Sequence, residues 1–331
     1  MMNENEMIQK PFFDFLTKRK SQEQVLYGMM EVLNLRKGAC YKRINGETAL
    51  TTAELVKLAN HFQVSLDGIF QADNYISFQH SFAQNKTTFD PLSQFSFFSR
   101  PLNNPQSSKL TYLANELPVF YYFSHQYIYN FLSSIWRHMH SSESKLIIEE
   151  NPNVPIQLET IRREISSYYA GHPVTEIWNS NMFANLFQQI IFSITIRAFK
   201  NEAYVRNLMD DVKKLFNHLH ELAMSGTTVR DNKSGSERMI YLNEYGNFLN
   251  MVLYESDKFN ATCIGYDMPQ FIVSYNPAFY NFSKDWIQKI RRRSVLISSD
   301  GFQYREMFFI KMEQDLKSFE DKVEKLMAVY Y

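Results

Sequence analysis

The stretch from Asn34 to Phe70 constrains the fold most, because signals that start and end helices alternate there at short spacing. Arg36 to Asn45 predicts a short basic helix. Gly46 ends it, because a helix C-terminus favours a residue that tolerates positive φ. Thr51 or Thr52 is predicted to cap the next helix through its hydroxyl group. The apolar residues of that helix recur at the spacing of one helical face: Leu55, Leu58, Ala59 and Phe62.

Two more helices are predicted before this stretch. Apolar side chains repeat at helical spacing from Phe12 to Lys20 and again from Gln24 to Leu33, whereas residues 1–9 are polar and are predicted to fray. Asn34 then forms a turn, since asparagine adopts the left-handed conformation more readily than most residues. Short helices joined by tight turns predict an all-α helix-turn-helix domain over residues 10–72.

Residues 34–70 resemble the Cro/phage-repressor (XRE-type) helix-turn-helix family of transcriptional regulators. Three short segments fall in register with the pattern of that family: Asn45-Gly46, Ala49-Leu50 and Val64-Ser65-Leu66-Asp67. The string YKRINGE from Tyr41 to Glu47 is similar to a repressor-like group common in Bacteroidetes, whose members carry a large uncharacterised C-terminal region. The chain departs from the pattern before the turn: Ser21-Gln22-Glu23 precedes the usual helix start by about four residues, and Asn34 replaces a glycine.

The resemblance implies that residues 36–45 form a recognition helix, which lies in the major groove of double-stranded DNA. Carried over position by position, it implies base reading by a set of four residues: Lys37, Gly38, Ala39 and Lys42. It implies a contact to backbone phosphate for Asn45.

The residue types on this helix point to the same surface. If Cys40 and Ile44 pack inward, the side that carries Lys37, Gly38, Tyr41 and Lys42 faces outward. Lysine can reach the O6 and N7 atoms of guanine. Arg36 and Arg43 are added as phosphate contacts. The alternative is that this basic run is only a solvated helix face, as most charge runs are.

The charge of the chain is uneven. Its formal net charge is zero over 331 residues, so the chain as a whole is not a polycation. Residues 10–70 contain nine Lys and Arg against six Asp and Glu, a net charge of +3. This excess favours a sequence-specific reader with a few phosphate contacts over a non-specific coating protein.

No catalytic or cofactor-binding pattern emerges from the sequence. Cys40 and Cys263 provide neither a disulfide framework nor a cysteine zinc site. The His-x-His pairs at 138–140 and 218–220 would point in different directions on a helix. Glycine-rich phosphate loops and nucleophile motifs do not occur. We therefore expect no enzyme, no metal and no cofactor.

The sequence also carries no membrane signal. The N-terminal string MMNENEMIQK lacks an apolar core, and no run of about 18 uncharged apolar residues is present to span a bilayer. These features predict a cytoplasmic protein without a membrane partner.

The rest of the chain predicts a linker and a larger domain. Residues 73–108 hold three prolines among Ser, Asn and Gln, a composition typical of a linker. Residues 109–331 predict a mainly helical regulatory and dimerisation domain. Helical segments are expected at 110–140, 157–169, 174–225 and 285–292, and a flexible loop at 226–236. Runs at 239–242, 248–254 and 260–266 predict a small antiparallel sheet of three or four strands. The expected class is mainly α, with an all-α N-terminal domain and a helical α+β C-terminal domain.

The C-terminal helix, residues 305–331, carries an apolar seam spaced alternately by three and four residues: Phe309, Met312, Leu316, Phe319, Val323, Leu326 and Tyr330. Helix-turn-helix proteins bind two-fold DNA sites as dimers, so this seam is a candidate contact of a homodimer. The alternative is an amphipathic helix that packs on its own domain.

Together these features predict a sequence-specific DNA-binding transcriptional regulator. Its C-terminal domain is expected to mediate dimerisation. A second possible role of this domain is the sensing of a small-molecule effector, whose identity the sequence does not give. One alternative is a protein–protein interaction scaffold whose degenerate helix-turn-helix does not bind DNA. A third hypothesis is an enzyme with the helix-turn-helix as an appendage, which would require a body carboxylate or histidine with a shifted pKa in a cleft.

Overall fold

The computed structural model describes residues 4–18, 20–62, 64–66, 69, 76–78, 108–149, 156–230, 233–246, 248–257, 259–267 and 269–330. The chain divides into two compact units, one of residues 1–79, 255–262 and 273–282, and one of residues 80–254, 263–272 and 283–331. We call residues 4–69 the head, and the elements from residue 108 onward the body. The predicted linker at 73–108 lies almost entirely outside the described residues.

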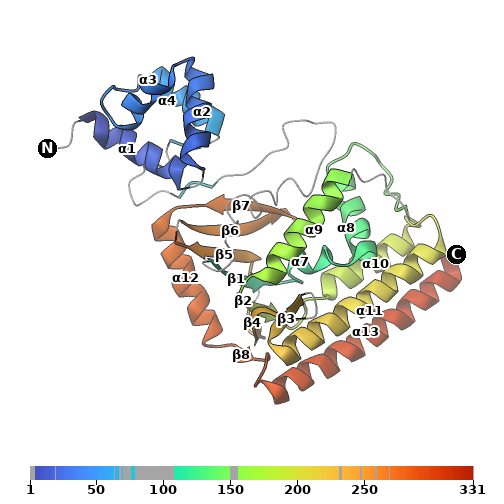
Figure 1. Cartoon of the computed structure of the whole chain (residues 1–331). Helices are drawn as coiled ribbons and strands as arrows, with labels where there is room; N and C mark the ends of the chain where they lie inside the picture. The colour runs from blue at the N-terminus through green and yellow to red at the C-terminus, as the bar shows by residue number, and fades with distance from the viewer. Residues whose placement is uncertain are drawn as a thin grey trace. The chain divides into compact units, whose positions relative to one another are not determined.

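Among the described residues of the head, four helices enclose one hydrophobic core. They are α1 (Glu4–Thr17), α2 (Gln22–Leu33), α3 (Lys37–Ile44) and α4 (Thr52–Phe62) (Figure 1). Each contributes buried apolar side chains to the core: Phe12, Phe13, Leu16, Val25, Leu26, Met29, Cys40, Leu58, Ala59 and Phe62. Because α1 begins at Glu4, the prediction that residues 1–9 fray is wrong for residues 4–9.

Reciprocal side-chain caps determine where two of these helices begin. The Ser21 hydroxyl accepts a hydrogen bond from the Gln24 amide at 3.2 Å, and the Gln24 side chain accepts one from the Ser21 amide at 3.1 Å. Thr51 and Glu54 form the same pair at α4, at 3.2 and 2.8 Å, which confirms the predicted threonine cap. The segment Ser21-Gln22-Glu23, which precedes the helix start expected from the family pattern, contains the cap and the first residues of α2.

Left-handed residues end α2 and α3 at the predicted positions. Asn34 has φ 52° and ψ 47°, and its backbone amide donates to the carbonyl of Met30. Gly46, after α3, has φ 76°. Asparagine and glycine are the residues that tolerate this conformation best, so both predicted stop signals are confirmed.

Gly28 of α2 lies against the C-terminal residues of α4. A Cβ atom built on Gly28 would lie 2.7 Å from the ring of Phe62 and 2.9 Å from the imidazole of His61. Real Cβ atoms do not approach other atoms so closely. Glycine costs a helix interior roughly 1 kcal/mol relative to alanine, and here it permits the contact between the two helices.

The body combines helices with one large sheet (Figure 1). Its helices are α7 (Val119–Tyr122), α8 (Gln126–Met139), α9 (Ile156–Gly171), α10 (Ala184–Thr195), α11 (Glu202–Ser225), α12 (Pro277–Arg291) and α13 (Phe302–Tyr330). Its strands are β1 (Ser108–Ala114), β2 (Val174–Asn179), β3 (Thr227–Arg230), β4 (Lys233–Asn243), β5 (Met251–Ser256), β6 (Asn260–Asp267), β7 (Gln270–Ser274) and β8 (Val295–Leu296).

The sheet has eight strands in the order β3-β4-β2-β1-β5-β6-β7, and β8 pairs with β4. The strands β1, β2 and β4 are parallel neighbours, with Leu110 opposite Val174 and Val174 opposite Arg238. Parallel strands need long crossover connections, which here contain α7 to α9 and then α10 and α11. The pairings of β4 with β3 and β8 are antiparallel, so the sheet is mixed.

The predicted fold class is therefore wrong. The body is an α/β fold with a mixed eight-stranded sheet, not a mainly helical domain with a small antiparallel sheet. Residues 108–114 and 174–179 form β1 and β2, although both were assigned to helical segments. Strands at the centre of a parallel sheet are buried on both faces and read as apolar runs, which periodicity alone does not separate from a buried helix.

The prediction of a flexible loop at 226–236 is also wrong. Residues 227–230 form β3 and residues 233–236 begin β4, with Thr227 opposite Glu237 and Arg230 opposite Lys233. Thr and Val favour strands, but the polar residues and glycines of this segment are typical of loops and led to the wrong prediction.

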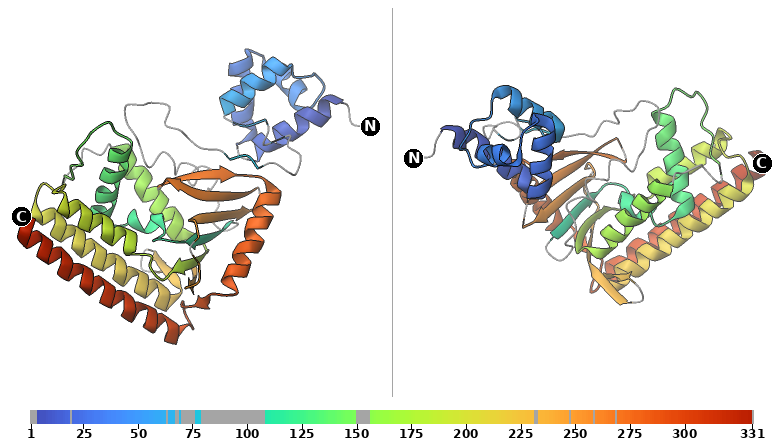
Figure 2. Two further views of the ribbon diagram at one scale, coloured as in Figure 1. Left: turned by 180° about the vertical axis from the view of Figure 1, so that it is seen from behind. Right: turned by 45° about the horizontal axis from the view of Figure 1, so that its top comes forward.

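The apolar seam of the C-terminal helix is covered within the same chain. Helices α10, α11 and α13 lie side by side (Figures 1 and 2). The ring of Phe319 stacks on Phe187 of α10 at 4.1 Å between centroids, and Phe309 meets Phe216 of α11 at 5.7 Å. Five seam residues are buried: Phe309, Met312, Leu316, Phe319 and Val323. The seam is thus part of the body core, which agrees with the alternative of an amphipathic helix that packs on its own domain.

A buried carboxylate lies in β2, an interior strand of the sheet. The side chain of Glu176 on β2 is fully buried and accepts hydrogen bonds from the hydroxyls of Tyr121 and Tyr169, at 2.5 and 2.8 Å, and from the indole of Trp178, at 2.6 Å. The guanidinium of Arg238 on β4 lies 3.5 Å from the same carboxylate. Burial and the nearby Glu176 charge raise the pKa of both tyrosines, so the hydroxyls stay protonated and donate.

Candidate nucleic-acid interface

The solvent-facing side of α3 carries most of the residues that were predicted to contact DNA. Six of the eight are exposed: Arg36, Lys37, Gly38, Tyr41, Lys42 and Asn45. Ala39 and Arg43 are half-buried. The inward side is anchored by Cys40, which is fully buried in the head core, and by the half-buried Ile44. The predicted orientation of this helix is confirmed.

The N-terminus of α3 carries cations where a helix favours anions. Arg36 is the residue before the first turn and Lys37 is the first helical residue. No acidic residue lies in that turn, and Arg36 makes no side-chain cap. Exposed amides and the positive end of the helix dipole attract negative groups and disfavour positive ones, by about 0.3–1 kcal/mol each. These two side chains weaken the helix slightly, but together with the free amides they form a surface suited to phosphate.

The exposed face of α3 is open at Gly38. Apart from the helix's own backbone and the two neighbouring residues, no described atom lies within 4 Å of a Cβ built on Gly38, so its backbone is accessible from outside. The ammonium of Lys37 lies 6.0 Å from the ring centroid of Tyr41, a cation–π arrangement that orients both side chains. Tyr41 itself is 47% exposed.

Arg43 does not belong to the free surface. Its guanidinium donates to Glu54 of α4 at 2.9 Å, and its side chain is only 16% exposed. The arginine holds the pKa of the Glu54 carboxyl below its usual range, together with the bonds from Thr51 and against the opposing effect of burial. Arg43 thus ties α3 to α4, and its predicted contact to phosphate stays a prediction.

Asn45 is exposed, and its side chain makes one hydrogen bond within the head. Its side-chain amide donates to the carboxylate of Glu47 at 3.4 Å. The Asn45 amide therefore lies beside a negative charge, and its predicted contact to phosphate stays a prediction.

Gln9 positions α3 and was missed in the sequence. Its side chain is buried, and its amide donates to the carbonyls of Arg43 at 2.7 Å and Thr48 at 3.0 Å. Its oxygen accepts from the amide of Leu50 at 3.1 Å. A single glutamine from α1 thus satisfies backbone groups at and beyond the C-terminus of α3. The amide chemistry was visible in the sequence, but the residue lay in the segment predicted to fray.

The described residues contain no group of three or more His, Cys, Asp or Glu side chains placed to hold a metal ion. Cys40 and Cys263 are both buried and free. Within the described part of the chain, no helix combines the length and hydropathy that a bilayer span requires. No family model, curated protein or solved structure matches the chain.

Proposed function

We propose that the protein is a sequence-specific DNA-binding transcriptional regulator of the XRE type, in which α3 is the recognition helix. The observation that carries this proposal is the surface at the start of α3, where Arg36 and Lys37 lie exposed beside uncapped amides. Lys42 extends the positive surface one turn further along the helix. None of the three cations has an ion-pair partner among the residues that the structure describes.

Each residue then has a separate role. Lys37 and Lys42 read base edges, where a good contact to guanine contributes about 1–3 kcal/mol of discrimination. Gly38 lets the backbone approach the groove, and Arg36 contacts phosphate. Such a regulator acts where the chromosome is, so we place it in the cytoplasm. The protein acts as a homodimer, because two-fold DNA sites match two-fold proteins, and the dimer forms through a surface other than the apolar seam of α13.

The test is binding of the full-length protein to fragments of the source genome, including its own upstream region, over a series of salt concentrations. We expect tight binding to a few fragments, with the logarithm of the binding constant falling linearly with the logarithm of salt concentration. The double variant Lys37→Ala/Lys42→Ala should lose tenfold or more in affinity for those fragments, by roughly 1–3 kcal/mol for each contact, and should no longer distinguish them.

The matched control is Lys18→Ala/Lys57→Ala, which removes the same charge from exposed positions on the head outside α3. This control should keep its preference among fragments. Weak binding that is indifferent both to sequence and to the α3 substitutions would refute the proposal and favour a protein-binding head.

A further inference from the structure

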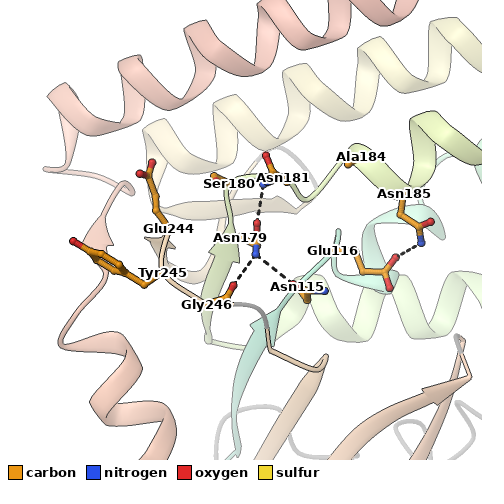
Figure 3. Close-up of a pocket in the computed structure, with 10 residues that line it drawn as sticks. All are labelled: Asn115, Glu116, Asn179, Ser180, Asn181, Ala184, Asn185, Glu244, Tyr245 and Gly246. Carbon is orange, nitrogen blue, oxygen red and sulfur yellow. Dashed lines mark hydrogen bonds between the residues drawn. The ribbon is translucent and has the colours of Figure 1, made fainter.

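The parallel strands β1, β2 and β4 end at one pocket in the body, with a volume of about 530 Å³ (Figure 3). Asn115 and Glu116 follow β1, residues 179–181 close β2, and residues 244–246 follow β4. Ligands of open α/β sheets bind at the carboxyl ends of the strands. The volume lies within the range of small-molecule sites, about 300–1,000 Å³.

The loops that line the pocket are fastened to one another. The side-chain amide of Asn179 donates to the Gly246 carbonyl at 2.9 Å and to the Asn115 side chain at 3.3 Å. Its oxygen accepts from the backbone amide of Asn181 at 2.8 Å. Figure 3 shows these three bonds converging on Asn179 between the ends of the strands. The pocket is therefore preformed, and a ligand need not order its walls.

A carboxylate is held at the opposite side of the pocket. Glu116 accepts hydrogen bonds from the side-chain amides of Asn185, in the first turn of α10, at 2.7 Å and of Asn250 at 3.2 Å. Figure 3 shows the Glu116 and Asn185 side chains pointing toward each other. Neutral amides fix this carboxylate without neutralising its charge.

Other polar groups of the lining are unused. The carboxylate of Glu244 and the hydroxyls of Ser180 and Tyr245 make no hydrogen bond to any residue that the structure describes. The ten lining residues include two glutamates and four asparagines but no Lys, Arg or His. A lining with negative charge and without a cation disfavours phosphates and carboxylates as ligands.

We propose that this pocket binds a small uncharged molecule rich in hydroxyl groups, of the size of a monosaccharide. A hydroxyl both donates and accepts, so neighbouring hydroxyls can donate to the glutamates and accept from asparagine amides. Tyr245, which is 91% exposed, adds an aromatic face at the rim. The site lies wholly within the body and does not depend on whether the head binds DNA.

The experiment is titration of the full-length protein with D-glucose, D-galactose, D-ribose and myo-inositol, followed by calorimetry and by ligand-observed NMR. At least one of these probes should bind saturably at millimolar concentration, and inorganic phosphate should not compete with it. Ala184→Arg, which places a long side chain at the pocket wall, should abolish binding. Glu244→Gln should weaken it about tenfold, the value of a hydrogen bond to a charged group.

Both substitutions have matched controls at exposed positions. Gln188→Arg lies one turn further along α10, and Glu237→Gln lies on β4, both outside the lining. Each control should bind the probe like the wild type. The proposal is overturned if none of the four probes binds saturably, if phosphate displaces the bound probe, or if Ala184→Arg binds as well as Gln188→Arg.

Discussion

Arg36 on α3 and Arg238 on β4 carry the same guanidinium group in opposite surroundings. Arg238 is 1% exposed, donates to the backbone carbonyls of Tyr169 and His172, and faces Glu176. Arg36 is exposed, with no ion-pair partner in the described part of the chain. A folded protein tolerates a buried charge only when other polar groups of the protein replace the water that would hydrate it. An exposed charge with no partner adds little to folding and remains free to meet a ligand.

The comparison separates charges that hold the fold from charges that are available for binding. Substitution of the first kind should change stability, and substitution of the second kind should change affinity. Arg43 and Gln9 lie between these extremes, because both stabilise the head and also position α3.

The largest effect is expected for Glu176→Gln. The side-chain NH2 of glutamine is a donor, so it cannot accept the hydrogen bonds of Tyr121, Tyr169 or Trp178. The neutral side chain would also leave Arg238 without a counter-charge. Breaking a buried pair on one side costs about 3–5 kcal/mol. Urea unfolding of the body, followed by circular dichroism, measures this loss. The exposed neighbour variant Glu237→Gln should match the wild type within about 0.5 kcal/mol. An equally small change for Glu176→Gln would contradict the assigned role.

A smaller effect should appear on acidification. Burial lowers the pKa of His125, before α8, to about 4, against the weaker opposing effect of Asp211. The unfolded chain binds this proton near pH 6.5, so it holds more protons than the folded chain between about pH 6.5 and pH 4. The free energy of unfolding should therefore decrease as the pH is lowered from about 6.5 to 4, by up to about 3 kcal/mol.

The measurement is the urea midpoint at several pH values for the wild type and for His125→Gln. The variant should lose less stability than the wild type between pH 6.5 and pH 4.5. The pKa values of His172 and His218 are also lowered by burial, so the variant should retain part of the dependence. Identical slopes for the two proteins would show that His125 stays accessible to protons.

Gln9→Ala should affect both stability and affinity. Loss of its bonds leaves the carbonyls of Arg43 and Thr48 and the amide of Leu50 without their partner, which costs about 1–3 kcal/mol. Because these groups lie at the end of α3, affinity for a specific DNA fragment should fall as well. Thermal unfolding and DNA titration are the two measurements, with exposed Lys10→Ala as the control. Wild-type stability in Gln9→Ala would mean that water replaces the glutamine without loss.

The smallest effects distinguish two arginines of the same helix. Arg43→Ala should lower head stability by about 1 kcal/mol, through the loss of the partly buried pair with Glu54, and should leave the salt dependence of DNA binding unchanged. Arg36→Ala should keep the stability and reduce the slope of log affinity against log salt by about one. The reverse result would return Arg43 to the DNA surface and assign the structural role to Arg36.

The sequence predicted the head better than the body, for a physical reason. Helix caps and left-handed turns depend only on nearby residues. Thr51 therefore predicts a helix start, and Asn34 and Gly46 predict helix ends, whatever the rest of the chain does. The exposed side of α3 followed from the positions of Cys40 and Ile44. The ion pair between Arg43 and Glu54 joins two helices, and no local sequence signal at either residue predicts it.

In the body, the decisive contacts are distant in sequence. Leu110 pairs with Val174, and Val174 with Arg238, across 64 residues in each step. Apolar runs within longer helical segments do not announce such pairing. The pocket was missed for the same reason: the Asn-Glu after β1 and the Asn-Ser-Asn that closes β2 are recognisable only after both strands are known.

Gly28 has an evolutionary consequence. It has no side chain to contribute to binding, yet a Cβ atom there would lie 2.7 Å from the ring of Phe62 and 2.9 Å from the imidazole of His61, so both side chains would have to move. Lys37, Gly38 and Lys42 bear no such packing constraint. A library of variants that is randomised at all four positions and selected on new DNA sites should therefore return many solutions at the three positions on α3. At position 28, glycine should predominate among the survivors.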